Sequence, residues 1–131
     1  MTHPVLSQFF DALESERVLY CVLRDAERIP LMMDGEVDLL VAPDQWDQLS
    51  AVLTRVGFAP LASRGYAPHH FFVAYHADTD CWLKLDVVDE LVYGRPIKTL
   101  STGLAADVLA RRRRCGQAWA PAPEHELITL L

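Results

Sequence analysis

Apolar positions recur with a helical period in two segments of the first sixty residues. One predicted helix runs from Pro4 to about Leu13, and the other follows Pro43 and ends at Gly57, a residue suited to the position just past a helix end. The apolar faces comprise Val5, Leu6, Phe9, Phe10 and Leu13 in the first, and Trp46, Leu49, Val52, Leu53 and Val56 in the second. Residues 18–23 and 36–41 are short, apolar and β-branched, which predicts two strands.

The second half of the chain predicts a hairpin and a mixed C-terminal segment. Residues 70–75 and 81–88 have strand composition, and the turn residues 78–80 between them indicate an antiparallel pair. Proline and glycine predict mostly irregular structure over 58–68 and a break at Gly94–Pro96. The remaining expectations are a helix within 104–113, a short strand at 117–120 and a helix from Pro123.

This order of elements predicts a small α/β or α+β fold. We expect a mixed sheet with helices packed mainly on one face and an acidic cleft on the other. The length of 131 residues fits a single domain, residues 1–131. Within it, residues 104–131 are expected to form a C-terminal helical extension, whose apolar end either continues beyond the chain or docks on a protein partner.

Composition narrows the classes of partner. With 51% hydrophobic and 23% charged residues the chain is expected to fold, and its net charge of −6 argues against nucleic acid or anionic lipid as a general partner. No apolar run approaches the ~20 residues that a membrane helix needs, and the N-terminus lacks a signal-peptide pattern, which predicts a cytoplasmic protein. Cys21, Cys81 and Cys115 form no CxxC pair and are expected to be reduced thiols.

Carboxylates alternate with apolar residues on two of the predicted strands. Glu36 and Asp38 share one face of the first, while Asp86 shares the polar face of the other with Trp82 and Lys84. Neighbouring like charges are unfavourable unless they are solvated, protonated or bridged by a cation. The pattern therefore fits either a solvated face or, if the two strands are adjacent, an oxygen-only site for Mg²⁺.

Several of these motifs together resemble the nucleotidyltransferase superfamily. The matching residues are the strand 18–24, the acidic strand Gly35-Glu-Val-Asp-Leu-Leu-Val41 with the helix after it, and the later strand with Leu85-Asp86-Val87. The resemblance extends from the first helix to Gly94 and is closest to small domains encoded in bacterial gene clusters for polysaccharide or natural-product synthesis. The segment after Ala120 also resembles the start of the helical extension found after such domains.

The resemblance implies a nucleotidyltransferase-like fold and a Mg²⁺-dependent (or Mn²⁺-dependent) enzyme. Such an enzyme would move a nucleoside monophosphate from a nucleoside triphosphate to a hydroxyl or amine acceptor, with release of pyrophosphate. The implied metal-binding and catalytic residues are Glu36, Asp38 and Asp86, and the implied nucleotide-binding residues are Arg24, Asp25, Lys84 and His70.

One motif departs from the family pattern. Asp25-Ala26 stands where the family has glycine and serine, so the turn loses a close backbone approach and a hydroxyl donor and gains a charge that repels phosphates. The alternative is therefore a catalytically inactive nucleotidyltransferase-like binding module, or the recognition part of a longer enzyme.

Other polar clusters have less specific interpretations. Arg24 could contact phosphates or, better, pair with Asp25 or Glu27, and Lys84 could reach a triphosphate or simply neutralise Asp86. The histidines at 69, 70 and 76 match no zinc spacing. The run Arg111–Arg114 fits either a phosphate-bearing partner or, better, a solvated helix C-terminus. Trp82 and Trp119 could stack on a base or belong to the core.

Overall fold

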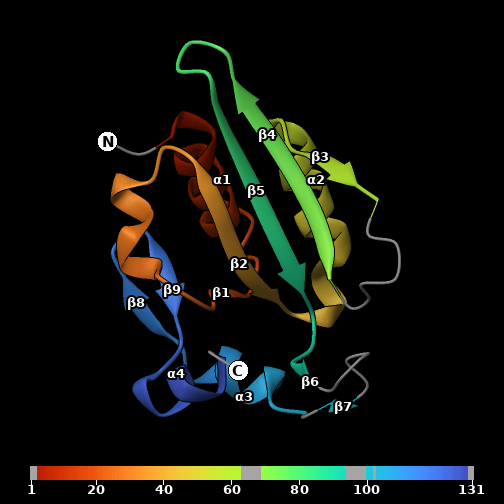
Figure 1. Cartoon of the computed structure of the whole chain (residues 1–131). Helices are drawn as coiled ribbons and strands as arrows, with labels where there is room; N and C mark the ends of the chain where they lie inside the picture. Colours follow the sequence, from red (N-terminus) through yellow and green to blue (C-terminus); the bar gives the residue numbers. More distant parts are fainter. Residues whose placement is uncertain (1–2, 63–68, 94–99, 102, 130–131) are drawn as a thin grey trace.

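A five-stranded mixed sheet forms the centre of the protein, in a computed structural model that describes residues 3–62, 69–93, 100–101 and 103–129 (Figure 1). The strand order is β1-β2-β5-β4-β3, and every neighbouring pair is antiparallel except β2 and β5, which are parallel. The strands are β1 (Tyr20–Val22), β2 (Gly35–Val41), β3 (Ala59–Leu61), β4 (His70–His76) and β5 (Cys81–Val88). The fold is therefore α+β, as predicted.

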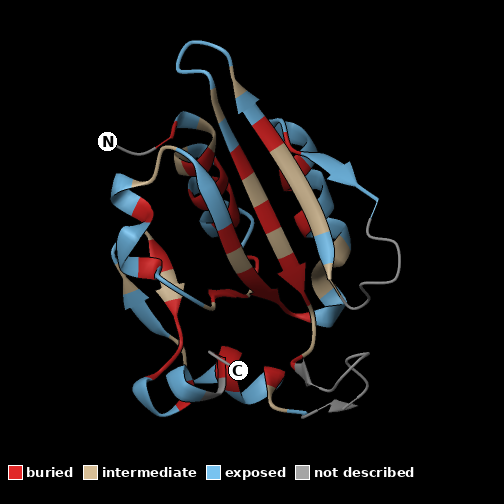
Figure 2. Cartoon of the chain, viewed as in Figure 1, coloured by how far each residue is buried: buried red, intermediate tan, exposed pale blue. Residues whose placement is uncertain are grey.

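Two helices cover one face of the sheet. These are α1 (Pro4–Ser15) and α2 (Trp46–Val56), which pack against each other and against the sheet behind it in Figure 1. Along β5 the residues Leu83, Leu85 and Val87 are fully buried, and the residues between them are not, an alternation visible in Figure 2. Burial of each such side chain contributes roughly 1.5–3 kcal/mol, so this period-two pattern fixes which face carries the polar residues.

Both large helices have defined ends. The His3 side chain caps α1, because its Nδ1 accepts a hydrogen bond from the Val5 N–H at 3.1 Å. Gly57 ends α2 in a left-handed conformation with φ of 103°, and its N–H donates to the Leu53 carbonyl at 3.1 Å. The predicted stop at Gly57 is confirmed.

The C-terminal third packs against one end of the sheet. It contains α3 (Ala105–Ala110), α4 (Pro123–Thr129) and two small two-stranded sheets, and α3 joins a separate apolar cluster with residues of β1 and β2. The small sheets pair β6 (Val92–Tyr93) with β7 (Leu100–Ser101), and β8 (Arg113–Cys115) with β9 (Ala118–Ala120). Nowhere in the described part of the chain is there a helix with the length and apolarity needed to cross a membrane.

Several sequence predictions need correction. Residues 59–61 form an edge strand on β4 where mostly irregular structure was expected, and the 104–131 segment contains the β8–β9 hairpin as well as helices. The arginine run is a helix C-terminus only at its first residue, because Arg111 is the C-cap of α3 whereas Arg113 already belongs to β8. The predicted break at Gly94–Pro96 and the end of the predicted irregular stretch, 63–68, lie outside the described residues.

Candidate functional site

Three carboxylates meet on the sheet face opposite α1 and α2. Asp38 on β2 and Asp86 on β5 are direct register partners in the parallel pair, and Glu36 lies two residues before Asp38 on the same face. One carboxylate oxygen from each of the three residues lies within 4.8 Å of the others. The adjacency of the two acidic strands, which the sequence left as a condition, is present in the structure.

Each of these carboxylates also has a cationic or hydrogen-bonding neighbour. Arg24 Nη1 lies 3.2 Å from Asp38 Oδ2, and Lys84 Nζ lies 3.7 Å from Glu36 Oε2. Both side chains therefore neutralise acids, but other acids than the sequence suggested: Arg24 pairs with Asp38 and not with Asp25 or Glu27, and Lys84 pairs with Glu36 and not with Asp86. The positive groups come from β5 and from the segment after β1, so the acids are surrounded by partners from different elements.

The two aspartates of the acidic cluster are mostly shielded from solvent. The side chains of Asp38 and Asp86 are only 22% and 16% exposed. Burial raises the pKa of Asp38, the charge of Asp86 raises it further, and the Arg24 guanidinium partly opposes both effects. Three converging carboxylates are a donor set that fits a hard cation such as Mg²⁺ or Mn²⁺, and a bound cation would offset the cost of ionising Asp38.

The histidine beside the acids is His69, not His70. His69 Nδ1 and Asp86 Oδ1 share a hydrogen bond of 2.7 Å. The ring of His70 instead packs on Trp46 with a centroid distance of 4.6 Å, and its register partner is Val87, whose side chain is buried under the helices. Adjacent strand residues point to opposite faces, and His69 immediately precedes β4. Alternation along the chain predicts that only one of the two histidines faces the acids, and the pairing of His70 with the buried Val87 decides that it is His69.

The turn after β1 lies next to the acids. Asp25 adopts φ of 57° in the left-handed region, with an exposed carboxylate, and begins the short 3₁₀ helix η1 (Ala26–Leu31). Arg24, immediately before it, reaches Asp38 as described. The turn therefore presents an exposed acidic side chain next to the arginine that pairs with Asp38.

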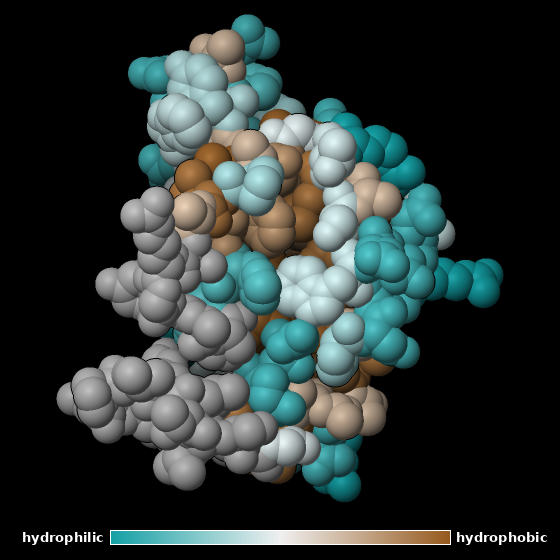
Figure 3. All heavy atoms as spheres, turned by 90° about the vertical axis from the view of Figure 1, so that its right-hand side faces the viewer, coloured by the Kyte–Doolittle hydropathy of each residue, from teal (hydrophilic) through white to brown (hydrophobic). Residues whose placement is uncertain are grey.

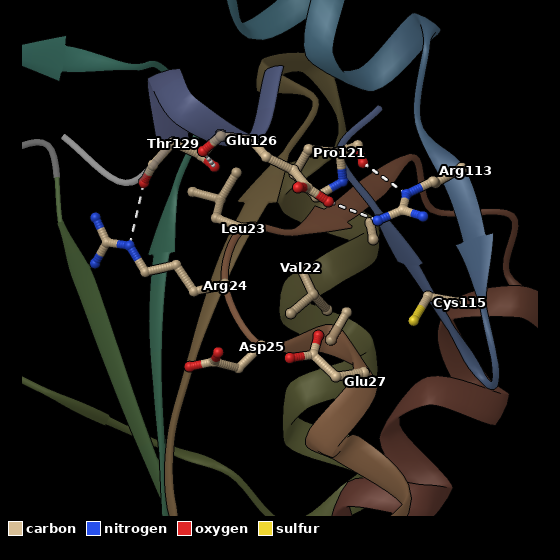
Figure 4. Close-up of a pocket in the computed structure, with 12 residues that line it drawn as sticks. Val22, Leu23, Arg24, Asp25, Glu27, Arg113, Cys115, Pro121, Glu126 and Thr129 are labelled. Carbon is tan, nitrogen blue, oxygen red and sulfur yellow. Dashed lines mark hydrogen bonds and ion pairs between the residues drawn. The ribbon is translucent and has the colours of Figure 1, made fainter. Parts of the chain in front are cut away.

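A pocket of about 360 Å³ adjoins this turn (Figure 4). Its lining combines the end of β1, the start of η1, the β8–β9 hairpin and α4. Arg24 Nε donates to the Thr129 carbonyl at 3.1 Å, and Arg113 bonds both the Pro121 carbonyl and the Glu126 carboxylate. Asp25 and Glu27 line the same pocket, so its charged groups are of both signs.

The remaining polar candidates have structural partners. Arg112 donates to the Tyr20 carbonyl at 2.7 Å and lies over the Trp119 ring at 4.1 Å. Arg114 pairs with Glu14. Within the described residues, the acidic cluster is the one group of three or more His, Cys, Asp or Glu side chains close enough to share a metal ion, and it contains neither histidine nor cysteine.

No protein-family model matches the sequence, and neither a curated protein nor a solved structure matches the chain.

Proposed function

We propose that the protein is a Mg²⁺-dependent nucleotidyltransferase, which moves a nucleoside monophosphate from a nucleoside triphosphate to a hydroxyl or amine acceptor with release of pyrophosphate. The observation that carries this proposal is the convergence of Glu36, Asp38 and Asp86 on one face of adjacent parallel strands. Carboxylates in this arrangement suit a divalent cation that neutralises phosphate oxygens during an in-line displacement.

The proposal gives each residue near the acids a distinct task. Glu36, Asp38 and Asp86 would hold the ion, which when bound polarises the phosphate and stabilises the charge that develops on it. Arg24 would exchange its contact with Asp38 for the triphosphate, since a guanidinium binds phosphate oxygens with planar, paired donors. Lys84 would likewise exchange its contact with Glu36 for a phosphate oxygen.

A second candidate function is a catalytically inactive module that binds a nucleotide or a protein. Two observations favour it. The Asp25 carboxylate lies at the turn where phosphates would approach, and Arg24, Lys84 and His69 already satisfy the three acids within the chain. An internally neutralised cluster has less need of a metal ion than a bare one.

A calorimetric titration separates the two candidates. The four ribonucleoside triphosphates are titrated with and without Mg²⁺ into the wild-type protein, Asp38→Asn and Asp47→Asn. Asp47 is an exposed acid on α2 and serves as the matched control. The proposed enzyme requires Mg²⁺-dependent binding that is lost in Asp38→Asn and kept in Asp47→Asn, followed by pyrophosphate release.

Other results have defined meanings. Nucleotide binding that requires Asp38 but gives no pyrophosphate with any acceptor supports the inactive module. Binding or turnover that survives in Asp38→Asn would refute the assignment of the acidic cluster as the metal site.

A further inference from the structure

A second hollow lies on the same face of the sheet, toward the turn between β4 and β5. Its volume is about 500 Å³, and its lining includes Asp34, Val73, Asp80, Trp82 and Lys84. Figure 3 views the molecule from the edge formed by β3 and shows apolar surface below this turn, which is a different surface from the hollow between β5 and the start of β2. Lys84 connects the hollow to the acidic cluster, because it lines the hollow and also pairs with Glu36.

An exposed aromatic pair stands beside the hollow, and one of its two members, Trp82, lines it. Tyr75 and Trp82 are register partners across β4 and β5, with ring centroids 4.8 Å apart and planes inclined at 42°. They remain 44% and 58% exposed, although large aromatic side chains on a sheet of this size are usually buried. Tyr75 is held in place, because its hydroxyl donates to Asp80 Oδ1 at 2.6 Å.

The charge around the aromatic pair is negative. Asp34 and Asp80 contribute carboxylates to the hollow, while the one cation in its lining, Lys84, is paired with Glu36. A tryptophan face attracts cations more strongly than any other aromatic side chain, and nearby carboxylates add to that attraction. The exposed ring of Trp82, held against Tyr75 and flanked by these two aspartates, is a surface that suits an organic ammonium group.

We propose that this hollow binds an organic ammonium group and that, in the reaction proposed above, it is the subsite for an amine-bearing acceptor. In-line displacement places the attacking group opposite the leaving pyrophosphate. With Arg24 and the turn after β1 on one side of the acids, the acceptor approaches from the β4–β5 side. The acceptor role, unlike the binding itself, rests on the proposed nucleotidyl transfer.

The strand geometry also sets the length of such an acceptor. Trp82 precedes Asp86 by four residues on β5, which corresponds to roughly 13 Å at about 3.3 Å per residue. An acceptor that has its ammonium group on Trp82 must therefore carry its nucleophilic hydroxyl or amine about that far away. This favours an extended molecule over a compact one.

The test uses choline and its neutral isostere, in which carbon replaces nitrogen. Both are titrated into the full chain, and binding is followed by backbone amide shifts of Val73 and Lys84 in NMR spectra. An exposed cation–π contact predicts that choline binds about two- to fivefold more tightly than the isostere. Trp82→Ala abolishes that preference, Trp82→Phe retains part of it, and Asp80→Asn weakens choline binding alone.

Leu31→Ala is the matched control, because Leu31 is an exposed apolar residue on η1 and does not line the hollow. Equal affinity for the two probes, or an unchanged preference in Trp82→Ala, would overturn the ammonium site. Selective choline binding without any Mg²⁺–nucleotide binding would instead keep the site and overturn the proposed transferase. Nucleotide binding with no choline preference overturns the ammonium site and its acceptor role, and leaves the proposed transferase standing.

Discussion

Asp38 and Asp86 lie directly opposite each other in the parallel pairing of β2 and β5, and each is held by a partner from outside that pair, Arg24 or His69. Two facing carboxylates on neighbouring strands repel each other, so their partners matter to both folding and binding. The acidic cluster is consequently neutralised in part by the chain itself before any ligand arrives.

We expect Arg24→Gln to have opposite effects on two ligands. Without the guanidinium near Asp38, Mg²⁺ alone should bind up to about fivefold more tightly, which corresponds to the 0–1 kcal/mol of an exposed ion pair. Mg²⁺–nucleotide binding should weaken, because a phosphate contact is lost. Calorimetry measures both affinities. Arg28→Gln, an exposed arginine on η1, should change neither, and weaker binding of Mg²⁺ alone in Arg24→Gln would contradict the prediction.

Asp38→Asn should leave the melting temperature unchanged or raise it at neutral pH without divalent ions. The pKa of Asp38 is raised on folding, chiefly by burial, so the ionised carboxylate opposes folding at pH 7. As the pH falls through the raised pKa toward 3.8, the wild-type side chain takes up its proton and this penalty disappears. Any advantage of the variant should therefore shrink in acid. Thermal denaturation of both proteins at pH 7 and near pH 3.8 measures this difference in stability. A variant less stable than the wild type at pH 7 would contradict the prediction.

His3 should make the stability depend on pH near neutrality. Burial is the main cause of the lowered pKa of His3, and the nearby His76 lowers it further. A group whose pKa is depressed on folding stabilises the protein above its unfolded pKa of 6.5, and that contribution is lost as the pH falls below it. The free energy of unfolding should drop between pH 7 and 5. His3→Asn, which keeps a capping side chain, should show a smaller drop, whereas an identical pH dependence would remove His3 as its source.

Alanine substitutions of the neighbouring residues Arg111 and Arg112 should differ sharply in their effect on stability. Arg112 is half-buried, donates to the Tyr20 carbonyl and stacks on Trp119, so Arg112→Ala should lose about 1–3 kcal/mol of stability. Arg111 is exposed, with a loose 3.9 Å contact to Glu124, and Arg111→Ala should change stability by less than about 0.5 kcal/mol. Urea denaturation of both variants measures the difference, and equal losses would contradict the structural role of Arg112.

Two of the three cysteines should react in the native protein. Burial raises the pKa of the Cys21 thiol to about 12, so this cysteine presents almost no thiolate at pH 8. Cys81 and Cys115 are partly exposed. A colorimetric thiol reagent should therefore titrate two thiols before unfolding and the third only in denaturant. Rapid reaction of all three thiols in the folded protein would disprove the burial of Cys21.

The acidic cluster was accessible to sequence analysis because it depends on strand alternation. Glu36 and Asp38 had to share a face, and Asp86 had to project away from Leu85 and Val87. The sequence could not establish which strands are neighbours, because the parallel pairing of β2 with β5 joins segments that are separated by α2 and two further strands. Long-range pairings of this kind depend on tertiary packing and leave no local signal.

Predictions failed where short segments take their conformation from distant partners. The proline in β3 predicts a loop, yet the segment pairs with β4. β3 is an edge strand, where a missing N–H is tolerated. The sequence predicts a solvated helix end for the arginine run, but Arg112, Arg113 and Arg114 donate to carbonyls or carboxylates of other segments. The sequence predicted His70 where the structure has His69, because the register of β4 against β5, which no local signal reveals, decides which of the two faces the acids.

The bond from Arg24 to the Thr129 carbonyl links the last turn of α4 to the residue that neutralises Asp38. Removing the chain after Ala122 would delete that carbonyl together with one wall of the adjoining pocket. A shortened protein could then keep its sheet and its three acids and still show altered ion affinity. Because Arg24 contacts both α4 and Asp38, shortening the tail would change the charge environment of the carboxylates without altering any of them.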